Sequence, residues 1–418
     1  MNHSPVPQPA RQPHWLLAGL LVSALALGCA QRTPPEPNQP APVAAAAAAP
    51  AATATPACSA QGAARFRLLG EERWGLEMQF AGVPVGGLSS IDYNPADDRY
   101  YLVSDDRSAH DSARLYRASI RYDAKGLQQV QLEQAIYMGA PDGQPYANQR
   151  NARAGIAVPD PEALRVLPGS QGLVWSSEGD FARGFGPELN EATLDGRWLR
   201  HWPLPQHLQL PDGDASRTGP RNNMTLEGMA ISADQRTLWL AMEGALKQDG
   251  PLPARGHAGG PLRITEYDIA TRQPLRQIAY VPDALPPDNF TLPLLAVNGV
   301  SDILADGPNH LLVLERAYVL GSGFSVRLYR IATDASSGAS NTLDRDRLVD
   351  GQFASVRKEL LLDAAQLGLK TVDNLEGMTW GPRLPSGERV LLLVSDNNFN
   401  PAEVTQFVAL AESAPCLQ

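Results

Sequence analysis

Two short segments of the chain place a glutamate inside an apolar run that otherwise has the pattern of a β-strand. TLEGMAIS spans 225–232 and NLEGMTWG spans 374–381, so Glu227 and Glu376 share one local context. A carboxylate entering a core costs free energy unless a cation or hydrogen-bond donor meets it. The recurrence therefore indicates a role that both copies share.

Three further segments align with these two: GLSSIDYNP (87–95), DPEALRVLP (160–168) and GVSDILADG (299–307). The aligned position holds Ser89, Glu162, Glu227, Asp302 and Glu376. Four acids brought to one place repel one another and raise each other's pKa, and a bound divalent cation relieves this. An all-oxygen set suits Ca²⁺ best and Mg²⁺ less well, and the lack of His and Cys argues against zinc. The alternative, in which these acids only cap loop amides or pair with arginines, stays open.

A second apolar run follows each segment and ends in an acid. The runs are YYLVSDD (100–106), GLVWSSEGD (172–180), TLWLAMEG (237–244), HLLVLER (310–316) and RVLLLVSDN (389–397). Their terminal acids are Asp105, Asp106, Glu178, Glu243, Glu315 and Asp396. Nearby cations, Arg107, Arg183, Lys247 and Arg316, are candidates for binding an anionic substrate, with ordinary surface salt bridges as the alternative.

Acids surrounded by cations are typical of metal-assisted hydrolysis of a phosphate ester or anhydride. Glu243 and Glu178 are the candidate general bases, and the four cations would hold the anion. Other chemistries lack their motifs: there is no G-x-S-x-G, no G-x-x-x-x-G-K-[ST] and no H-E-x-x-H.

The elements that must position these residues form a repeat of four strands. A third strand follows at 113–120, 188–194, 263–269, 325–332 and 403–410, and a fourth at 127–138, 197–204, 274–281 and 356–363. Repeats of four antiparallel strands predict an all-β fold, a single β-propeller. The count gives five blades, with six as the alternative, and the strand at 65–74 completes the last blade.

The ends of the chain indicate export. Arg11 and His14 precede the apolar run 15–28, which ends at Cys29, so residues 1–29 are predicted to be a signal peptide. Cys29 is expected to be lipidated, with plain signal-peptidase cleavage as the alternative. Residues 30–57 are rich in Pro and Ala and predict an extended tether. Residues 58–418 form the propeller domain, and Cys58 and Cys416 are expected to form a disulfide, with two free thiols as the alternative. We expect an outer-membrane lipoprotein that faces the periplasm or the cell surface.

The overall charge limits the possible partners. The 418 residues carry a formal net charge of −10, so neither nucleic acid nor an anionic membrane surface attracts the chain electrostatically. The expected partner is a small anionic, phosphorylated substrate. Membrane contact is expected only through the lipid anchor, and the protein is expected to be a monomer.

The segments GLSSIDYNPADDRYYLVSDDR, NMTLEGMAISADQRTLWLAMEG and NLEGMTW resemble the phytase-like propeller family, described by an esterase-like activity of phytase, over about residues 65–412. The five-residue ring also resembles that of the calcium-activated nucleotidases. The second resemblance implies that Ser89, Glu162, Glu227, Asp302 and Glu376 hold a central Ca²⁺. A non-catalytic scaffold with structural calcium stays open as the alternative function.

Overall fold

A computed structural model describes residues 65–413 except 154, 212–216 and 288–294. The chain divides into two units, Met1–Ala54 and Thr55–Gln418, and every described residue belongs to the second. The predicted signal peptide, the tether, the lipidation site Cys29 and the disulfide partners Cys58 and Cys416 lie outside the described residues.

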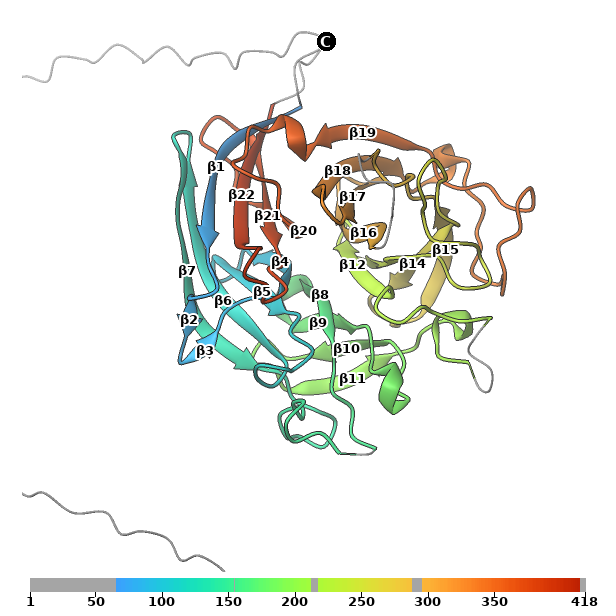
Figure 1. The fold of residues 1–418 in the computed structure, drawn as a ribbon, viewed down its shortest axis with the longest axis horizontal. Helices are drawn as coiled ribbons and strands as arrows, with labels where there is room; N and C mark the ends of the chain where they lie inside the picture. Colours follow the sequence, from blue (N-terminus) through green and yellow to red (C-terminus); the bar gives the residue numbers. More distant parts are fainter. Residues whose placement is uncertain (1–64, 154, 212–216, 288–294, 414–418) are drawn as a thin grey trace, which may run out of the picture. The chain divides into compact units, whose positions relative to one another are not determined.

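The described residues form five four-stranded antiparallel sheets in a ring, which is the predicted five-bladed β-propeller (Figure 1). Blade 1 holds β4 (Leu88–Asn94), β5 (Arg99–Ser104), β6 (Arg114–Asp123) and β7 (Gly126–Tyr137). Blade 2 holds β8 (Pro161–Val166), β9 (Leu173–Ser177), β10 (Glu188–Ala192) and β11 (Trp198–Trp202). Blade 3 holds β12 (Leu226–Ile231), β13 (Thr237–Met242), β14 (Leu262–Asp268) and β15 (Pro274–Tyr280).

Blade 4 holds β16 (Ala296–Ala305), β17 (His310–Val319), β18 (Gly323–Ala332) and β19 (Lys358–Asp363). Blade 5 holds β20 (Leu375–Gly381), β21 (Arg389–Ser395), β22 (Thr405–Glu412) and β1 (Phe66–Trp74). A small hairpin joins β2 (Gln79–Phe80) to β3 (Val83–Pro84). Five 3₁₀ turns complete the described elements: η1 (Pro168–Ser170), η2 (Phe181–Arg183), η3 (Gln206–Leu208), η4 (Ala335–Ser337) and η5 (Ala364–Gln366).

The ring closes as the sequence predicts, because β1 pairs with β22 from the other end of the chain. The register runs from Phe66 opposite Glu412 to Trp74 opposite Thr405. The Trp74 and Phe407 rings pack edge to face with centroids 4.7 Å apart. Closure of this kind gives blade 5 its fourth, outermost strand and covers the edge of β22 that would otherwise be unpaired.

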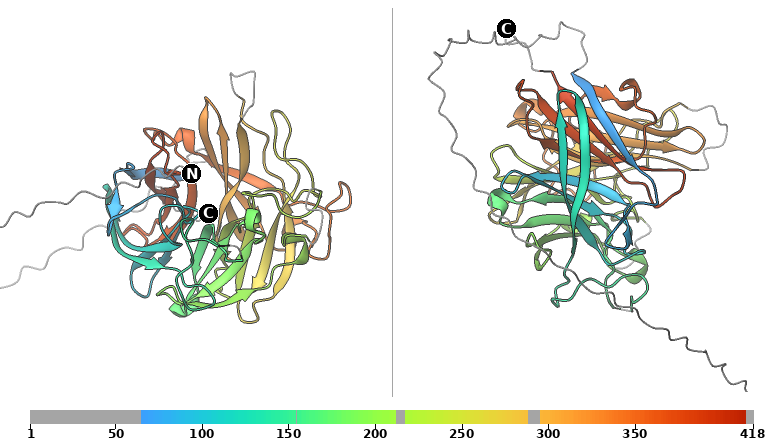
Figure 2. Two further views of the ribbon diagram at one scale, coloured as in Figure 1. Left: turned by 60° about the horizontal axis from the view of Figure 1, so that its bottom comes forward. Right: turned by 90° about the vertical axis from the view of Figure 1, so that its left-hand side faces the viewer.

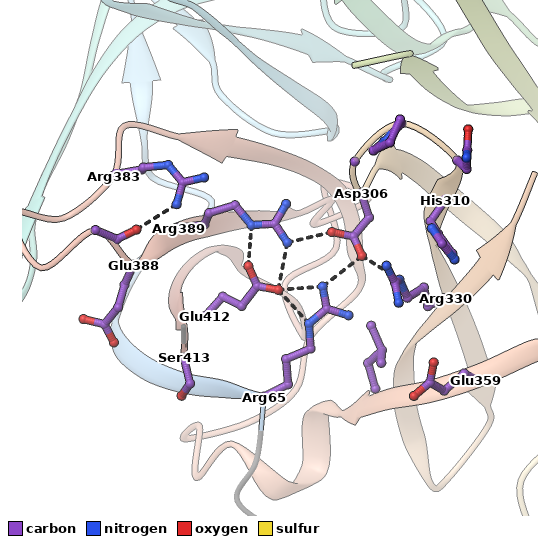
Figure 3. A pocket seen from close by; sticks show the side chains of 15 residues that line it. Arg65, Asp306, His310, Arg330, Glu359, Arg383, Glu388, Arg389, Glu412 and Ser413 are labelled. Carbon is purple, nitrogen blue, oxygen red and sulfur yellow. Dashed lines mark hydrogen bonds and ion pairs between the residues drawn. The ribbon is translucent and has the colours of Figure 1, made fainter. Parts of the chain in front are cut away.

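Ion pairs reinforce the closing seam at one end of β1 (Figure 3). Arg65 donates to Glu412 at 2.6 Å and to Asp306 of blade 4 at 2.8 Å. Arg389 and Arg330 contact the same Asp306 at 2.6 Å and 2.9 Å. Burial alone would raise the pKa of Asp306, but Arg65 and Arg389 lower it. The network ties the first strand of the domain to both β22 and blade 4.

The core lies between neighbouring blades, because each sheet packs a face on each of its two neighbours. Trp175 and Trp239 are examples of its large buried side chains. None of the described helical segments is long and apolar enough to cross a membrane. The first strand of every blade, β4, β8, β12, β16 and β20, lies nearest the centre of the ring (Figure 1).

Candidate functional site

The first strand of each blade carries a β-bulge, and in four of the five blades it falls on the position that the repeat singles out. In blade 3, Leu226 pairs with Met242 and Gly228 pairs with Ala241, so Glu227 has no partner on the next strand. A bulge redirects the side chain of the unpaired residue. The pairing skips the corresponding residues Ser89, Glu162 (with Ala163), Ser301 and Glu376 in the other blades.

The structure corrects the predicted alignment in blade 4 by one residue. Val300 pairs with Glu315 and Asp302 with Leu314, so the bulge falls on Ser301 and not on Asp302. The sequence alignment matched acid to acid, whereas hydrogen-bond register sets which residue bulges. Asp302 instead accepts two hydrogen bonds from Arg165, both at 2.9 Å.

A second tier of side chains lies on or directly after the second strand of each blade, one residue after the partner of the residue that precedes the bulge. It consists of Asp105, Glu178, Glu243, Arg316 and Asp396. The backbone fixes this tier: the amide of Glu243 donates to the carbonyl of Thr225 at 2.7 Å, and that of Asp396 to Asn374 at 3.1 Å. Blade 4 therefore differs in both tiers, with Ser301 and Arg316 where most other blades carry acids.

The two tiers meet in a cavity of ≈ 600 Å³ at one mouth of the channel. Its lining includes Asp105, Glu162, Glu227, Glu243, Arg316, Glu376 and Asp396. Two groups of three acids have ligand oxygens within 4.8 Å of one another, and Glu162 belongs to both. The first adds Asp105 and Asp160, and the second adds Glu178 and Glu227.

Burial and mutual repulsion both penalise the charges of these carboxylates. Burial, followed by the nearby Glu243, raises the pKa of Glu178 to about 8. Burial raises the pKa of Glu243 to about 7 and that of Asp160 to about 6. Burial, together with neighbouring acids, also raises the pKa of Glu227 well above its usual value. Without a cation these carboxyls favour their protonated forms, and a bound cation would stabilise the deprotonated carboxylates instead.

Several of the carboxylate oxygens lack hydrogen-bond partners. Among the described residues, Asp105 Oδ1, Asp160 Oδ1 and Glu178 Oε2 are buried without one. Such atoms are rare in folded proteins and call for a ligand or ion. The atoms available as metal ligands are carboxylate oxygens of blades 1, 2 and 3. Such a set of ligands fits a hard divalent cation rather than zinc or copper.

Two of the four predicted cations lie at this cluster. The Arg316 side chain is 12% exposed, and its Nη2 lies 2.8 Å from Glu376 Oε1 and 3.3 Å from Glu243 Oε1. Burial opposes the charge of Arg316, but these two glutamates raise its pKa. Arg107 is half exposed and contacts Asp160 Oδ2 at 3.1 Å.

The other two cations lie outside the cavity. Arg183 pairs with Asp180 at 2.5 Å, and Lys247 lines a different hollow together with Arg217 and Arg347. The turns that follow β9 and β13 therefore carry these side chains away from the acids. Two further acids are also withdrawn: Asp106 pairs with Arg114 at 2.6 Å and Glu315 with Lys358 at 2.5 Å.

Sequence reasoning missed Arg165, which spans the channel from β8. Its guanidinium contacts the carbonyls of Ile91, Ile303 and Met378, and these belong to β4, β16 and β20. Its partner Asp302 accepts from the amide of Met229 in β12 at 3.3 Å. The pair thus connects the inner strands of all five blades. An arginine in DPEALRVLP has no sequence signal for such a role.

Asp160 was also missed as a site residue, although it lies two positions before Glu162 in the repeat segment of blade 2. Its carbonyl accepts from the amide of Glu178 at 2.9 Å, which places its side chain beside both tiers. The corresponding residues of blades 1, 3 and 5 are Gly87, Thr225 and Asn374, so no shared residue type marked the position.

The sequence profile described as "Phytase-like: Esterase-like activity of phytase" matches residues 83–399. The chain belongs to this family of propeller proteins. It is also 26% identical over 140 residues to an uncharacterized secreted protein of Arthroderma benhamiae, a match that covers 28% of this chain and 27% of that protein.

Solved structures with similar folds include two distant proteins. A bifunctional GH43-CE protein of Bacteroides eggerthii has a TM-score of 0.37 and 10% identity over 77% of this chain and 33% of its own. The hydrazine synthase of Kuenenia stuttgartiensis has a TM-score of 0.34 and 13% identity over 77% of this chain and 79% of its own. Similarities this low carry no argument about function.

Proposed function

We propose that the protein is an exported, calcium-dependent hydrolase of phosphate esters or anhydrides. The observation that carries the proposal is the cluster of buried carboxylates in which oxygens of Asp105, Asp160 and Glu178 lack partners among the described residues. The cluster borders a cavity that Asp105, Glu162, Glu227 and Arg316 line. Family membership supports a hydrolytic, metal-dependent activity.

Two overlapping groups of residues could hold the metal: Asp105, Asp160 and Glu162, or Glu162, Glu178 and Glu227. Calcium accepts six to eight oxygens in flexible geometry, which suits carboxylates contributed by separate blades. When bound, Ca²⁺ neutralises the carboxylates, polarises a phosphoryl oxygen and lowers the pKa of a bound water.

The protein residues would then divide the remaining work. Arg316 would contact a phosphoryl oxygen and hold the group in line for attack. Glu243, which keeps one oxygen near Arg316, would accept the proton of the attacking water with the other. Water adds to phosphorus, the bond to the leaving oxygen breaks, and the leaving group takes a proton from solvent. Glu178 is the alternative base.

Export and anchoring are part of the proposal and rest on the sequence. The apolar run 15–28 and the following Cys29 support cleavage and lipidation, and one relative is named as a secreted protein. Cell fractionation with radiolabelled palmitate would test this. Incorporation that a Cys29→Ala substitution abolishes is the expected result, and an unlabelled cytoplasmic protein would contradict it.

Activity on p-nitrophenyl phosphate, nucleoside diphosphates and phytate tests the catalytic proposal. We expect turnover that EDTA abolishes and Ca²⁺ restores, and no turnover in a Glu227→Ala, Glu376→Ala double variant. Glu388→Gln is the matched control, because Glu388 accepts from Arg67 in an exposed pair and does not line the cavity. Activity that persists in EDTA would overturn the proposal.

A structural calcium in a non-catalytic scaffold is the second candidate. It is favoured by the engagement of Arg316 with two carboxylates and by the position of Arg183 and Lys247 outside the cavity. A calcium-dependent rise in melting temperature without turnover of any of these substrates would select the scaffold.

A further inference from the structure

The strands of blade 4 extend further beyond the ring of bulges than those of the other blades. β16 begins at Ala296, five residues before Ser301, whereas the first strands of the other four blades each begin one residue before their bulge. At about 3.4 Å per residue, the four additional residues add roughly 14 Å of strand on the side of the acidic cavity. β17 pairs with this extension as far as Val319, and β18 pairs with β17 as far as Gly323. Figure 2 shows these strands projecting beyond the ring.

The extension presents a row of apolar side chains to the cavity. Val297 pairs with Tyr318, and Tyr318 pairs with Phe324, so the three side chains lie side by side on one face. All three line the cavity, and the Tyr318 and Phe324 rings lie 4.9 Å apart. All three are only half-buried, so their apolar surface is available to a ligand.

This row continues directly from Arg316. Side chains two residues apart on a strand share a face, so Tyr318 lies next to Arg316 and one step further from the channel. Gly299 lies opposite Arg316 on β16, where a Cβ atom would come within 2.6 Å of Glu243 Cγ. Because Gly299 has no side chain, the apolar row continues directly into the acidic floor of the cavity, which the carboxylates beside Arg316 form.

Another part of the lining is polar and comes from blade 5. It consists of Asn374, Asn398, Asn400 and Glu403, and Asn398 and Asn400 donate to Glu403 at 2.8 Å and 2.7 Å. Asn374 is 3% exposed, and its Oδ1 is buried with no partner among the described residues. The cavity thus has an acidic floor, an apolar wall and a polar wall.

The charge of the cavity limits the phosphate content of its ligand. Among the described residues that line it, Arg316 is the one cation, and two glutamates already engage it. A ligand with several phosphates would meet too few positive charges to offset its desolvation. A single phosphoryl group joined to an apolar body matches the cavity better.

We propose that the substrate is a phosphate monoester of an aromatic or similarly flat apolar alcohol. Its organic group would lie against Val297, Tyr318 and Phe324, and its phosphoryl group would lie over the acidic floor beside Arg316. This inference rests on the proposed function and adds the substrate class to it.

Calorimetric titration of the calcium-loaded protein with two phosphonates that it cannot hydrolyse tests the inference. 1-Naphthylphosphonate and methylphosphonate share the phosphonate group and differ only in the apolar part. We expect the naphthyl compound to bind at least about tenfold more tightly, because an aromatic face covered by Tyr318 and Phe324 removes apolar area from water.

Substitutions on the wall locate the effect. Phe324→Ala should weaken binding of the naphthyl compound about tenfold and of the methyl compound less than about twofold, and Phe324→Leu should retain most of the affinity. Leu320→Ala is the matched control, because Leu320 is exposed at the tip of the same hairpin and does not line the cavity.

Each outcome has a defined meaning. Equal affinities for the two phosphonates would overturn the inference and leave the proposed function intact. Failure of both phosphonates to bind would overturn both the inference and the proposed function. The ratio of affinities in the unsubstituted protein decides the question even if Phe324→Ala does not fold.

Discussion

Asp302→Asn should destabilise the propeller strongly, because it removes one partner of a buried ion pair. The Asp302 and Arg165 side chains are 1% and 2% exposed. The substitution keeps the shape of the side chain but removes the carboxylate that pairs with the buried guanidinium, which costs about 3–5 kcal/mol. The carboxylate also accepts from the amides of Met229, Ile303 and Met378. Asn has one acceptor oxygen, so an orphaned amide adds about 1 kcal/mol.

The reciprocal substitution separates charge from shape. Arg165→Met leaves Asp302 with its backbone amides, so we expect a smaller loss of about 3 kcal/mol. The double variant should lose less free energy of unfolding than the sum of the two single-variant losses, by about 2 kcal/mol or more. The reason is that the double variant leaves no buried charge without its partner. Urea unfolding followed by tryptophan fluorescence measures each free energy of unfolding. A loss below about 1 kcal/mol for Asp302→Asn would refute the reasoning.

Three further predictions concern packing, pH and ring closure. Gly377→Ala places a Cβ 2.8 Å from the Ser90 Cα in the neighbouring blade, so a loss of about 2 kcal/mol in urea unfolding is expected, and unchanged stability would contradict the packing. Burial and then Arg263 lower the pKa of His207 to about 4. The unfolded chain therefore binds an additional proton between about pH 6.5 and pH 4, and stability falls as the pH drops through that window. His207→Gln should flatten this fall in melting temperature, and an unchanged pH slope would count against it. Trp74→Ala should cost about 2–3 kcal/mol by removing the contact with Phe407 across the closing seam, and a wild-type melting temperature would show that closure contributes little.

The sequence was sufficient to predict the fold because each blade repeats one order of strands. Period-2 alternation located the strands, and the absence of a fourth strand after 403–410 required one from the start of the domain. The closing strand was predicted at 65–74 and lies at Phe66–Trp74.

The candidate site was predictable where the repeat is regular and not where it changes. Glu227 and Glu376 share the LEG motif, and the bulge falls on both. In blade 4 the acid follows the bulge by one residue, and only the pairing of Val300 with Glu315 shows this.

Closeness in sequence was also a poor guide to the positions of the cations. Lys247 follows Glu243 by four residues, yet it lines a different hollow because the intervening turn leads away from the channel. Arg316 immediately follows Glu315, and the register rather than the residue type places it in the second tier of blade 4.

Calcium titration of the chelator-treated protein by isothermal calorimetry tests the central claim most directly. We predict saturable binding with a dissociation constant between about 10⁻⁶ and 10⁻³ M. Glu227→Gln should weaken that binding by at least about tenfold, whereas Glu388→Gln should leave it unchanged. A protein that binds no calcium up to roughly 10 mM, or a Glu227→Gln variant that binds it as the wild type does, would contradict the claim that these buried carboxylates form a metal site.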